Sequence, residues 1–340
     1  MTAEIKSVAE STATTPAHIV LTFDNNKLAG ALYGQFDQHL ALLEQKLGVE
    51  MHSKGNELTI SGNPSEVDQA RRALELLHGM LQGGSEIAVS DVEGAIRMAI
   101  AHDDQLPLPT MDNRKARLSA AQIATRKRTI HARSPNQDRY MRALDEREMV
   151  FGIGPAGTGK TYLAVAHAAM LLERGMVERI ILSRPAVEAG ERLGFLPGDM
   201  KEKVDPYLRP LYDALYDMMP GDKVERAITA GVIEIAPLAF MRGRTLAHSA
   251  VILDEAQNTT PMQMKMFLTR LGEDARMIVT GDPSQIDLPP GTRSGLIEAL
   301  QVLKNVKNIA RVDFTEKDVV RHPLVAEIVA AYDRHGKRDG

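Results

Sequence analysis

The sequence contains no cysteine. Disulfide bonds, thiol nucleophiles and thiolate metal sites are therefore excluded, and any chemistry must rest on other side chains. The sequence also lacks any apolar run that approaches the roughly 18 residues of a membrane span. Residues 1–16 form a polar leader with Glu4 and Glu10, where a secretory signal needs an apolar stretch. These absences predict a cytoplasmic protein that does not enter a membrane.

The composition is typical of a folded, soluble protein. Hydrophobic residues make up 44% of the 340 residues, charged residues make up 25%, and the mean hydropathy is -0.20. At roughly 150 residues per domain, this length predicts about two domains. The net charge is only -4 and the pI is about 6.2, so attraction to nucleic acid would have to come from a local basic patch.

Residues 17–84 have the pattern of a small α+β domain. Its expected order is strand, helix, helix, strand, strand, helix, with Gly30 and Gly34 breaking the first helical stretch in two. This order resembles a minimal K-homology (KH) domain, which clamps single-stranded nucleic acid. The KH clamp is a Gly-x-x-Gly loop, and Gly30 and Gly34 are one residue too far apart to match it. RNA binding and a protein-contact role therefore both stay open for this domain.

Residues 85–134 indicate a short helix followed by a basic linker. The stretch from 113 to 134 contains no acidic residue, whereas its basic residues are Arg114, Lys115, Arg117, Arg126, Lys127, Arg128 and Arg133. Such a stretch can bind phosphates by releasing counterions. The alternative is a solvated linker without a ligand.

Residues 135–335 predict a second domain of the α/β class, followed by a tail at 336–340. Short apolar runs at 149–153, 180–182, 232–235, 251–253, 276–280 and 309–314 alternate with longer helical patterns. Continuous apolar runs are typical of parallel strands that are covered on both faces. We therefore expect a doubly wound parallel sheet with helices on both faces.

A phosphate-binding loop directly follows the first of these runs. It fits the pattern Gly-x-x-x-x-Gly-Lys-Ser/Thr, and a helix pattern continues from Tyr162. The residues expected to cradle the nucleotide are Gly154, Pro155, Ala156, Gly157, Thr158, Gly159, Lys160, Thr161 and Tyr162. Lys160 is expected to reach the β and γ phosphates, and Thr161 to offer its hydroxyl to Mg²⁺. ATP and Mg²⁺ are thus the predicted ligands.

Two further strand ends carry polar residues. Asp254 and Glu255 end an apolar strand, in the form of a Walker B site, in which Asp254 would hold Mg²⁺ through water and Glu255 would activate the attacking water. We take the strand at 232–235 as the one that intervenes between the two motifs, as in the P-loop class with an additional strand. Gln285 follows the run at 276–280 and is a candidate reader of the γ-phosphate, although a plain Gly-Pro turn is the alternative.

These residues together resemble a known group. Residues 254–257 and 280–285 are similar to motifs II and III of superfamily-one helicases, and Gln137 lies where those enzymes place an adenine-reading glutamine. The closer resemblance is to the PhoH-like ATPase family. It rests on residues 183–187, 194–199, 206–207, 240–245, 254–258 and 318–325, and it spans about 18–335.

The PhoH resemblance implies a P-loop NTPase with a RecA-like or helicase-like parallel sheet, which acts as a cytoplasmic ATPase linked to RNA. It also implies single-stranded RNA and a ribosomal-RNA-processing endoribonuclease as partners. The chain after Gln285 is too short for the second motor domain of those helicases. Movement along RNA would therefore need neighbouring subunits, most simply a homo-oligomeric ring such as a hexamer. Arg321 is the first candidate for an arginine finger supplied by the neighbour, and Arg293 is the second. Either could instead form a surface salt bridge.

Three arginines are expected at the ligand end of the sheet. In the helicase comparison Arg184, Arg242 and Arg244 line the single-strand path, and the alternative is that they pair with nearby acids. We therefore expect an RNA-stimulated, oligomeric ATPase that remodels or unwinds RNA. A nucleotide-gated switch that grips RNA or a protein without movement is the alternative. A small-molecule kinase is disfavoured, because such kinases generally lack a water-activating residue like Glu255.

Overall fold

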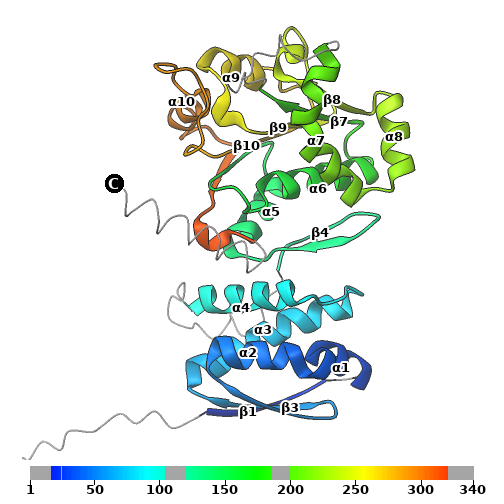
Figure 1. Ribbon diagram of the computed structural model, residues 1–340, viewed down its shortest axis with the longest axis vertical. Coiled ribbons are helices and arrows are strands. Elements are labelled where there is room, and N and C mark those ends of the chain that lie inside the picture. The colour runs from blue at the N-terminus through cyan, green and yellow to red at the C-terminus, as the bar shows by residue number, and fades with distance from the viewer. Residues whose placement is uncertain (1–16, 24, 104–119, 186–199, 321–340) are drawn as a thin grey trace, which may run out of the picture. The chain divides into compact units, whose positions relative to one another are not determined.

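The computed structural model describes residues 17–23, 25–103, 120–185 and 200–320 (Figure 1). The contacts divide the chain into two compact units, residues 1–119 and 120–340. In the ranges described, no helix combines the length and the apolar character that a membrane crossing requires.

The first unit contains the predicted strands and helices in the predicted order. They are β1 (Ala17–Thr22), α1 (Asn26–Tyr33), α2 (Gln38–Leu47), β2 (Glu50–Lys54), β3 (Glu57–Gly62), α3 (Pro64–Gln82) and α4 (Val89–Asp103). The strands form an antiparallel sheet in the order β1-β3-β2. Gly34 ends α1, as expected, but Gly30 lies inside this helix and does not break it. The relation to KH domains stays a prediction.

The helix that we assigned to the linker belongs to the first unit. Helix α4 packs against α3 and α2, and it buries Val92, Ala95, Ile96 and Ala99. Because these apolar side chains need a partner surface, the folded unit extends beyond residue 84.

The second unit begins before the boundary that we expected at residues 134 and 135. Strands β4 (Gln122–Ala124) and β5 (Thr129–His131) form a hairpin within it. At the turn, Lys127 Nζ donates to the carbonyl of Tyr216 at 2.7 Å and Arg128 Nη1 donates to Tyr162 Oη at 2.9 Å. This half of the basic stretch is thus anchored to the second unit and is not a solvated linker. Arg114, Lys115 and Arg117 lie outside the described residues.

A six-stranded parallel sheet forms the centre of the second unit. Its strands are β6 (Met149–Ile153), β7 (Arg179–Arg184), β8 (Ile233–Pro237), β9 (Ser249–Leu253), β10 (Arg276–Gly281) and β11 (Ile309–Asp313). Its helices are α5 (Pro135–Glu146), α6 (Lys160–Glu173), α7 (Met200–Met218), α8 (Gly221–Thr229), α9 (Pro261–Leu268) and α10 (Gly295–Val302). Every pair of neighbouring strands is parallel. The predicted strands and the P-loop NTPase fold class are confirmed.

The strand order corrects one expectation. The sheet runs β11-β6-β10-β9-β7-β8, so β10 lies between the strand of the phosphate-binding loop and the strand of Asp254. We had assigned that position to residues 232–235, which belong to β8 at the edge of the sheet. Residues that follow β10 therefore lie between the two motifs.

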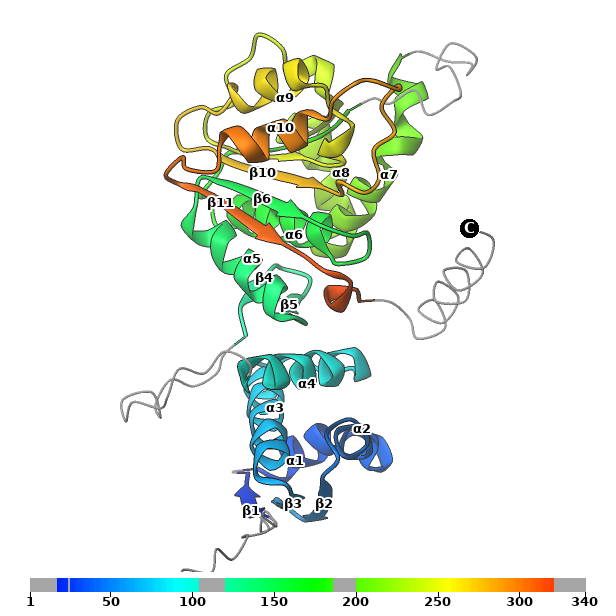
Figure 2. The same ribbon diagram turned by 90° about the vertical axis from the view of Figure 1, so that its left-hand side faces the viewer.

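Helices cover both faces of the sheet. Because successive side chains of a strand point to opposite faces, Val150 belongs to the apolar core that includes α5, α6 and α7, whereas Phe151 belongs to the core that includes α9 and α10. Figure 2 shows α9 and α10 on one face and α5 and α6 on the other. With both faces covered, the carboxyl ends of the parallel strands form the open edge on which a ligand can bind.

Candidate nucleotide-binding site

The phosphate-binding loop joins β6 to α6 at the carboxyl edge of the sheet. Gly154 has a φ of 141°, and a Cβ atom there would lie 2.4 Å from the carbonyl oxygen of Phe314. Gly159 has a φ of 85° and precedes the first turn of α6, where backbone N–H groups lack helical partners. The loop therefore requires glycine at both positions and offers an anion site at the start of a helix.

Lys160 is buried beneath this loop. Its Nζ donates to the carbonyl oxygens of Gly154 at 2.6 Å and Pro155 at 2.7 Å. Burial lowers the pKa of Lys160, against the opposing influence of Asp282, Asp254 and Glu255. The buried cation is thus bonded to the loop's own carbonyls, and carboxylates that follow β9 and β10 offset part of the effect of burial.

A cleft of about 490 Å³ lies at this edge of the sheet. The loop and the start of α6 form one side, and Asp213 and Asp217 of α7 form another. The predicted site residues that line it are Ala156, Gly157, Gly159, Lys160, Thr161, Tyr162, Arg184, Asp254, Glu255 and Gln285. The structure thus brings together residues that are far apart in the sequence, as the motif analysis predicted.

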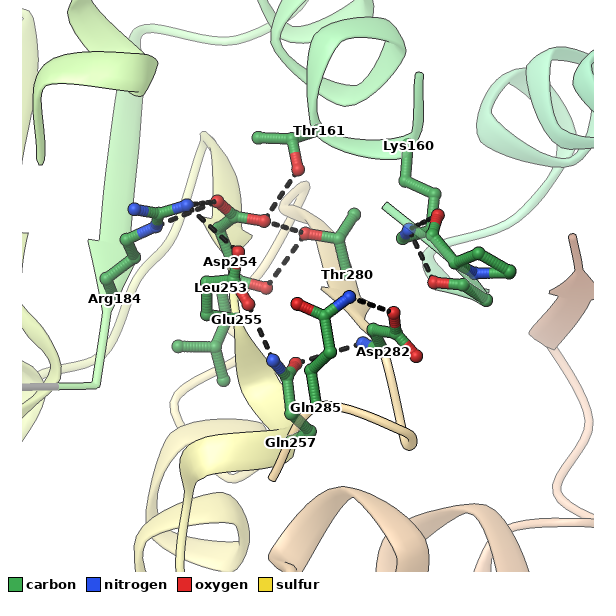
Figure 3. Close-up of polar contacts among 12 residues, drawn as sticks. Lys160, Thr161, Arg184, Leu253, Asp254, Glu255, Gln257, Thr280, Asp282 and Gln285 are labelled. Atoms are coloured by element: carbon green, nitrogen blue, oxygen red, sulfur yellow. Dashed lines mark hydrogen bonds and ion pairs between the residues drawn. The ribbon is translucent and has the colours of Figure 1, made fainter. Parts of the chain in front are cut away.

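The buried carboxylate of Asp254 lies at the centre of the polar contacts in Figure 3. Its Oδ1 accepts hydrogen bonds from Thr161 Oγ1 at 2.6 Å and from Thr280 Oγ1 at 2.7 Å. Thr161 therefore lies beside Asp254, as a shared magnesium site requires. A hydroxyl and a carboxylate are ligand types that suit Mg²⁺.

Arg184 faces Asp254 from the neighbouring strand (Figure 3). Its Nε and Nη2 lie 2.9 and 2.7 Å from Asp254 Oδ2, and Nη2 lies 3.1 Å from Glu255 Oε1. Its side chain is only 18% exposed. In this arrangement Arg184 pairs with carboxylates, as our alternative interpretation allowed, but its partners are the two acids of the Walker B motif.

Glu255 lies at the border of the cleft with its side chain 43% exposed. Its backbone has a φ of 53°, an uncommon conformation for a residue other than glycine. Gln257 Nε2 donates to Glu255 Oε2 at 2.6 Å, while Gln257 Oε1 accepts from the backbone N–H of Asp282 at 3.0 Å. Gln257 therefore connects the end of β9 to the segment that follows β10.

Gln285 reaches the cleft from that segment. Its Nε2 donates to Asp282 Oδ2 at 2.6 Å. Burial alone would raise the pKa of Asp282, but hydrogen bonds from Ser284 and Gln285 and the charge of Lys160 lower it. The segment is thus held with a charged Asp282 beneath Gln285, and a role for Gln285 at the γ-phosphate stays a prediction.

Sequence reasoning assigned no function to Thr280 and Gln257. Both were visible as parts of strand-end motifs, but their partners depend on which strands are neighbours. The parallel pairing of β9 with β10 places Thr280 next to Asp254. The sequence feature that could have identified Thr280 is a hydroxyl residue at the carboxyl end of a predicted strand.

Gln137 lies behind the loop and does not line the cleft. Its Nε2 donates to the carbonyl of Thr158 at 3.0 Å, and its Oε1 accepts from the backbone N–H of Arg133 at 2.8 Å. The residue is 4% exposed. In this position Gln137 supports the loop, and adenine reading stays a prediction.

The remaining arginines have different surroundings. Arg244 pairs with Glu234 at 2.6 Å, and this hydrogen bond is the main cause of the lowered pKa of Glu234. Arg242 and Arg293 are exposed, and their side chains make no hydrogen bond or ion pair within the described ranges. Arg293 is not among the residues that line the cleft. Arg321 lies outside the described residues.

With this geometry in place, comparison with known proteins gives the family. A family model described as PhoH-like protein matches residues 129–333. The chain belongs to the PhoH-like family. The match covers nearly all of the second unit, from strand β5 onward.

Relatives in this family extend the similarity to the first unit. A PhoH-like protein of Bacillus subtilis is 50% identical over 304 residues, which cover 89% of this chain and 93% of the relative. A PhoH-like protein of Mycobacterium bovis is 49% identical over 308 residues, covering 91% and 86%. Protein PhoH of Escherichia coli is 46% identical over 205 residues, covering 60% and 58%. Family membership and the P-loop fold establish a nucleotide-binding NTPase in general.

The site fits Mg²⁺ held together with a nucleotide. Among the residues that the structure describes, no group of three His, Asp or Glu side chains forms a metal cage of its own. Mg²⁺ is usually bound by one or two protein oxygens together with phosphates and water. The Thr161 hydroxyl and the Asp254 carboxylate match that requirement.

Proposed function

We propose that this chain is a Mg²⁺-dependent ATPase of the cytoplasm that acts on single-stranded RNA as a homo-oligomer. The observation that carries the hydrolytic part is the convergence of Lys160, Thr161, Asp254 and Glu255 on one cleft. Binding alone would not need a second carboxylate beside the metal-binding one. Glu255 lines the same cleft directly after Asp254, which supports its assignment as the residue that activates water.

Each of these residues has a separate role in hydrolysis. The loop's N–H groups and Lys160 bind the phosphates, and Thr161 with Asp254 would hold Mg²⁺, which supplies charge neutralisation on the phosphates. Glu255 orients a water molecule and accepts its proton. The chemistry needs a further cation near the terminal phosphate, and Arg321 or Arg293 of a neighbouring subunit is our candidate.

Arg242 supports the link to RNA. It is exposed, it ends the short helix Leu238–Met241 that follows β8, and it lies two residues after Phe240, which is 57% exposed. An exposed cation two residues from an exposed aromatic ring suits a phosphate and a base of one strand. Arg184 and Arg244, which already bind carboxylates, are weaker candidates for this path.

The test is ATP turnover titrated with single-stranded RNA. We expect stimulation of tenfold or more, with Lys160→Ala giving the background rate. Arg242→Ala should weaken the stimulation, whereas Arg226→Ala, which removes an exposed arginine from α8, should not. A slow rate that RNA does not change would favour the alternative function, a nucleotide-gated switch.

Arg321→Ala should lose turnover, and mixing this variant with Lys160→Ala should restore it, because each variant supplies the residue that the other lacks. This result would support the oligomer. A monomer with full turnover would contradict it.

A further inference from the structure

We infer that Arg184 is a latch that competes with Mg²⁺ for Asp254 and moves to the terminal phosphate of a bound nucleoside triphosphate. This inference rests on the proposed ATPase function and concerns the same cleft. It assigns to Arg184 a role in distinguishing triphosphate from diphosphate.

The first step is the set of atoms that Arg184 occupies. Two of its nitrogens lie within 2.9 Å of Asp254 Oδ2, the oxygen that does not accept from Thr161. Because Oδ1 already accepts from Thr161 and Thr280, Oδ2 is the oxygen more open to a metal-bound water. A guanidinium with its full positive charge, close to that oxygen, opposes the approach of a second cation.

The second step concerns Glu255. Both of its carboxylate oxygens accept from side chains, Oε1 from Arg184 at 3.1 Å and Oε2 from Gln257 at 2.6 Å. A general base needs an oxygen that faces the attacking water. Release of one of these donors would leave a whole carboxylate oxygen of Glu255 open to the attacking water.

Arg184 is the less enclosed of the two donors, with a side chain that is 18% exposed. Gln257 is 1% exposed and is also bonded to the backbone of Asp282, so its amide is fixed from both sides. Arg184 lines the cleft on a long side chain. Release of Arg184 alone would free both Glu255 Oε1 and Asp254 Oδ2.

The third step is the destination of the guanidinium. Leaving a carboxylate pair is favourable only when another anion replaces it, because an unpaired buried charge is strongly unfavourable. A phosphate accepts the arginine fork in the same bidentate manner as a carboxylate. Arg184 and Lys160 line the same cleft, so a terminal phosphate bound by Lys160 would enter the cleft that Arg184 lines.

The test compares the affinities of ADP and a non-hydrolysable ATP analogue for the full chain in the presence of Mg²⁺, by titration calorimetry. In Arg184→Ala, we expect the preference for the triphosphate to fall at least tenfold, while ADP binds as tightly as before or more tightly. Arg184→Lys keeps the charge but not the fork, and we expect an intermediate preference. If Arg184→Ala does not fold, the nucleotide preference of Arg184→Lys provides the test.

Arg244→Ala is the matched control. Arg244 is also carboxylate-paired and part-buried, but its partner is Glu234 of β8, and it is not among the residues that line the cleft. We expect the triphosphate preference of this variant to equal that of the wild type.

Two results would overturn the latch. Equal weakening of ADP and the analogue in Arg184→Ala would make Arg184 a fixed support of Asp254. Unchanged nucleotide affinities with weakened binding of single-stranded RNA would place Arg184 in an RNA path instead. The affinity assay requires no hydrolysis. The proposed ATPase is tested separately, by whether Lys160→Ala abolishes ATP turnover, so the failure of one proposal can be distinguished from the failure of the other.

Discussion

The buried imidazole of His167 makes the stability of the second unit sensitive to acid. His167 lies in α6, is 1% exposed, and its pKa is lowered from 6.5 to about 4. Burial is the largest cause, and the positive charges of Arg276 and Arg174 add to it. The carboxylate of Asp145 lies 3.5 Å from Nδ1, but its side chain is 63% exposed, so it does not offset the burial.

The sign of the effect follows from proton binding. Between pH 6.5 and 4 the unfolded chain binds a proton on His167 that the folded chain does not. The free energy of unfolding therefore falls as the pH falls through this window. These pKa values give a loss of about 2 kcal/mol between pH 7 and pH 5 from His167 alone.

The assay is urea unfolding at pH 7 and pH 5, followed by hydrogen exchange in peptides that cover α6. His167→Leu places an apolar side chain among the apolar residues of α6, and it should reduce the pH difference by about 2 kcal/mol. His52→Leu removes an exposed imidazole from β2 and serves as the control, with an unchanged difference. If His167→Leu retained the wild-type pH difference, the reasoning would be refuted.

Three further predictions concern the loop and its supports. Gly154→Ala should lower the melting temperature and abolish binding of the ATP analogue, because its Cβ would lie 2.4 Å from a backbone oxygen; unchanged melting would contradict this. Gln137→Ala should weaken ATP and GTP binding by the same factor, since Gln137 supports the loop; a selective loss of ATP would instead show adenine reading. The pKa of Asp318 is lowered, because hydrogen bonds from Asn136, Ser134 and Thr315 outweigh the effect of burial. Its stabilisation is present above the ordinary carboxyl pKa and is lost as the pH falls through the lowered value, so Asp318→Asn should reduce the acid dependence of unfolding measured below pH 4.

The strands and the phosphate-binding loop could be predicted because their signals are local. A buried parallel strand is a continuous apolar run, and the loop's glycines are required by backbone geometry that neighbouring residues create. Gly154 is an example, since its positive φ is needed whatever else surrounds it. Asp254 and Glu255 were found in the same way, as acids at the end of an apolar run.

The partners across the cleft could not be predicted, because they depend on strand order. No local pattern distinguishes β8 from β10 as the strand beside β6, and we chose the wrong one. Arg184 and Asp254 are separated by 70 residues, so their pairing follows only from the adjacency of β7 and β9. The hairpin of β4 and β5 was missed because strands of three residues carry too little alternation to detect.

The most direct test of the account is a paired measurement on Glu255→Gln, with ATP turnover and ATP-analogue affinity determined on the same preparation. We expect turnover to fall on the order of a hundredfold or more, as for loss of a general base, while the affinity stays close to that of the wild type. Glu225→Gln, an exposed change on α8, should leave both unchanged. Full turnover in Glu255→Gln would contradict the assignment of this site as the centre of hydrolysis.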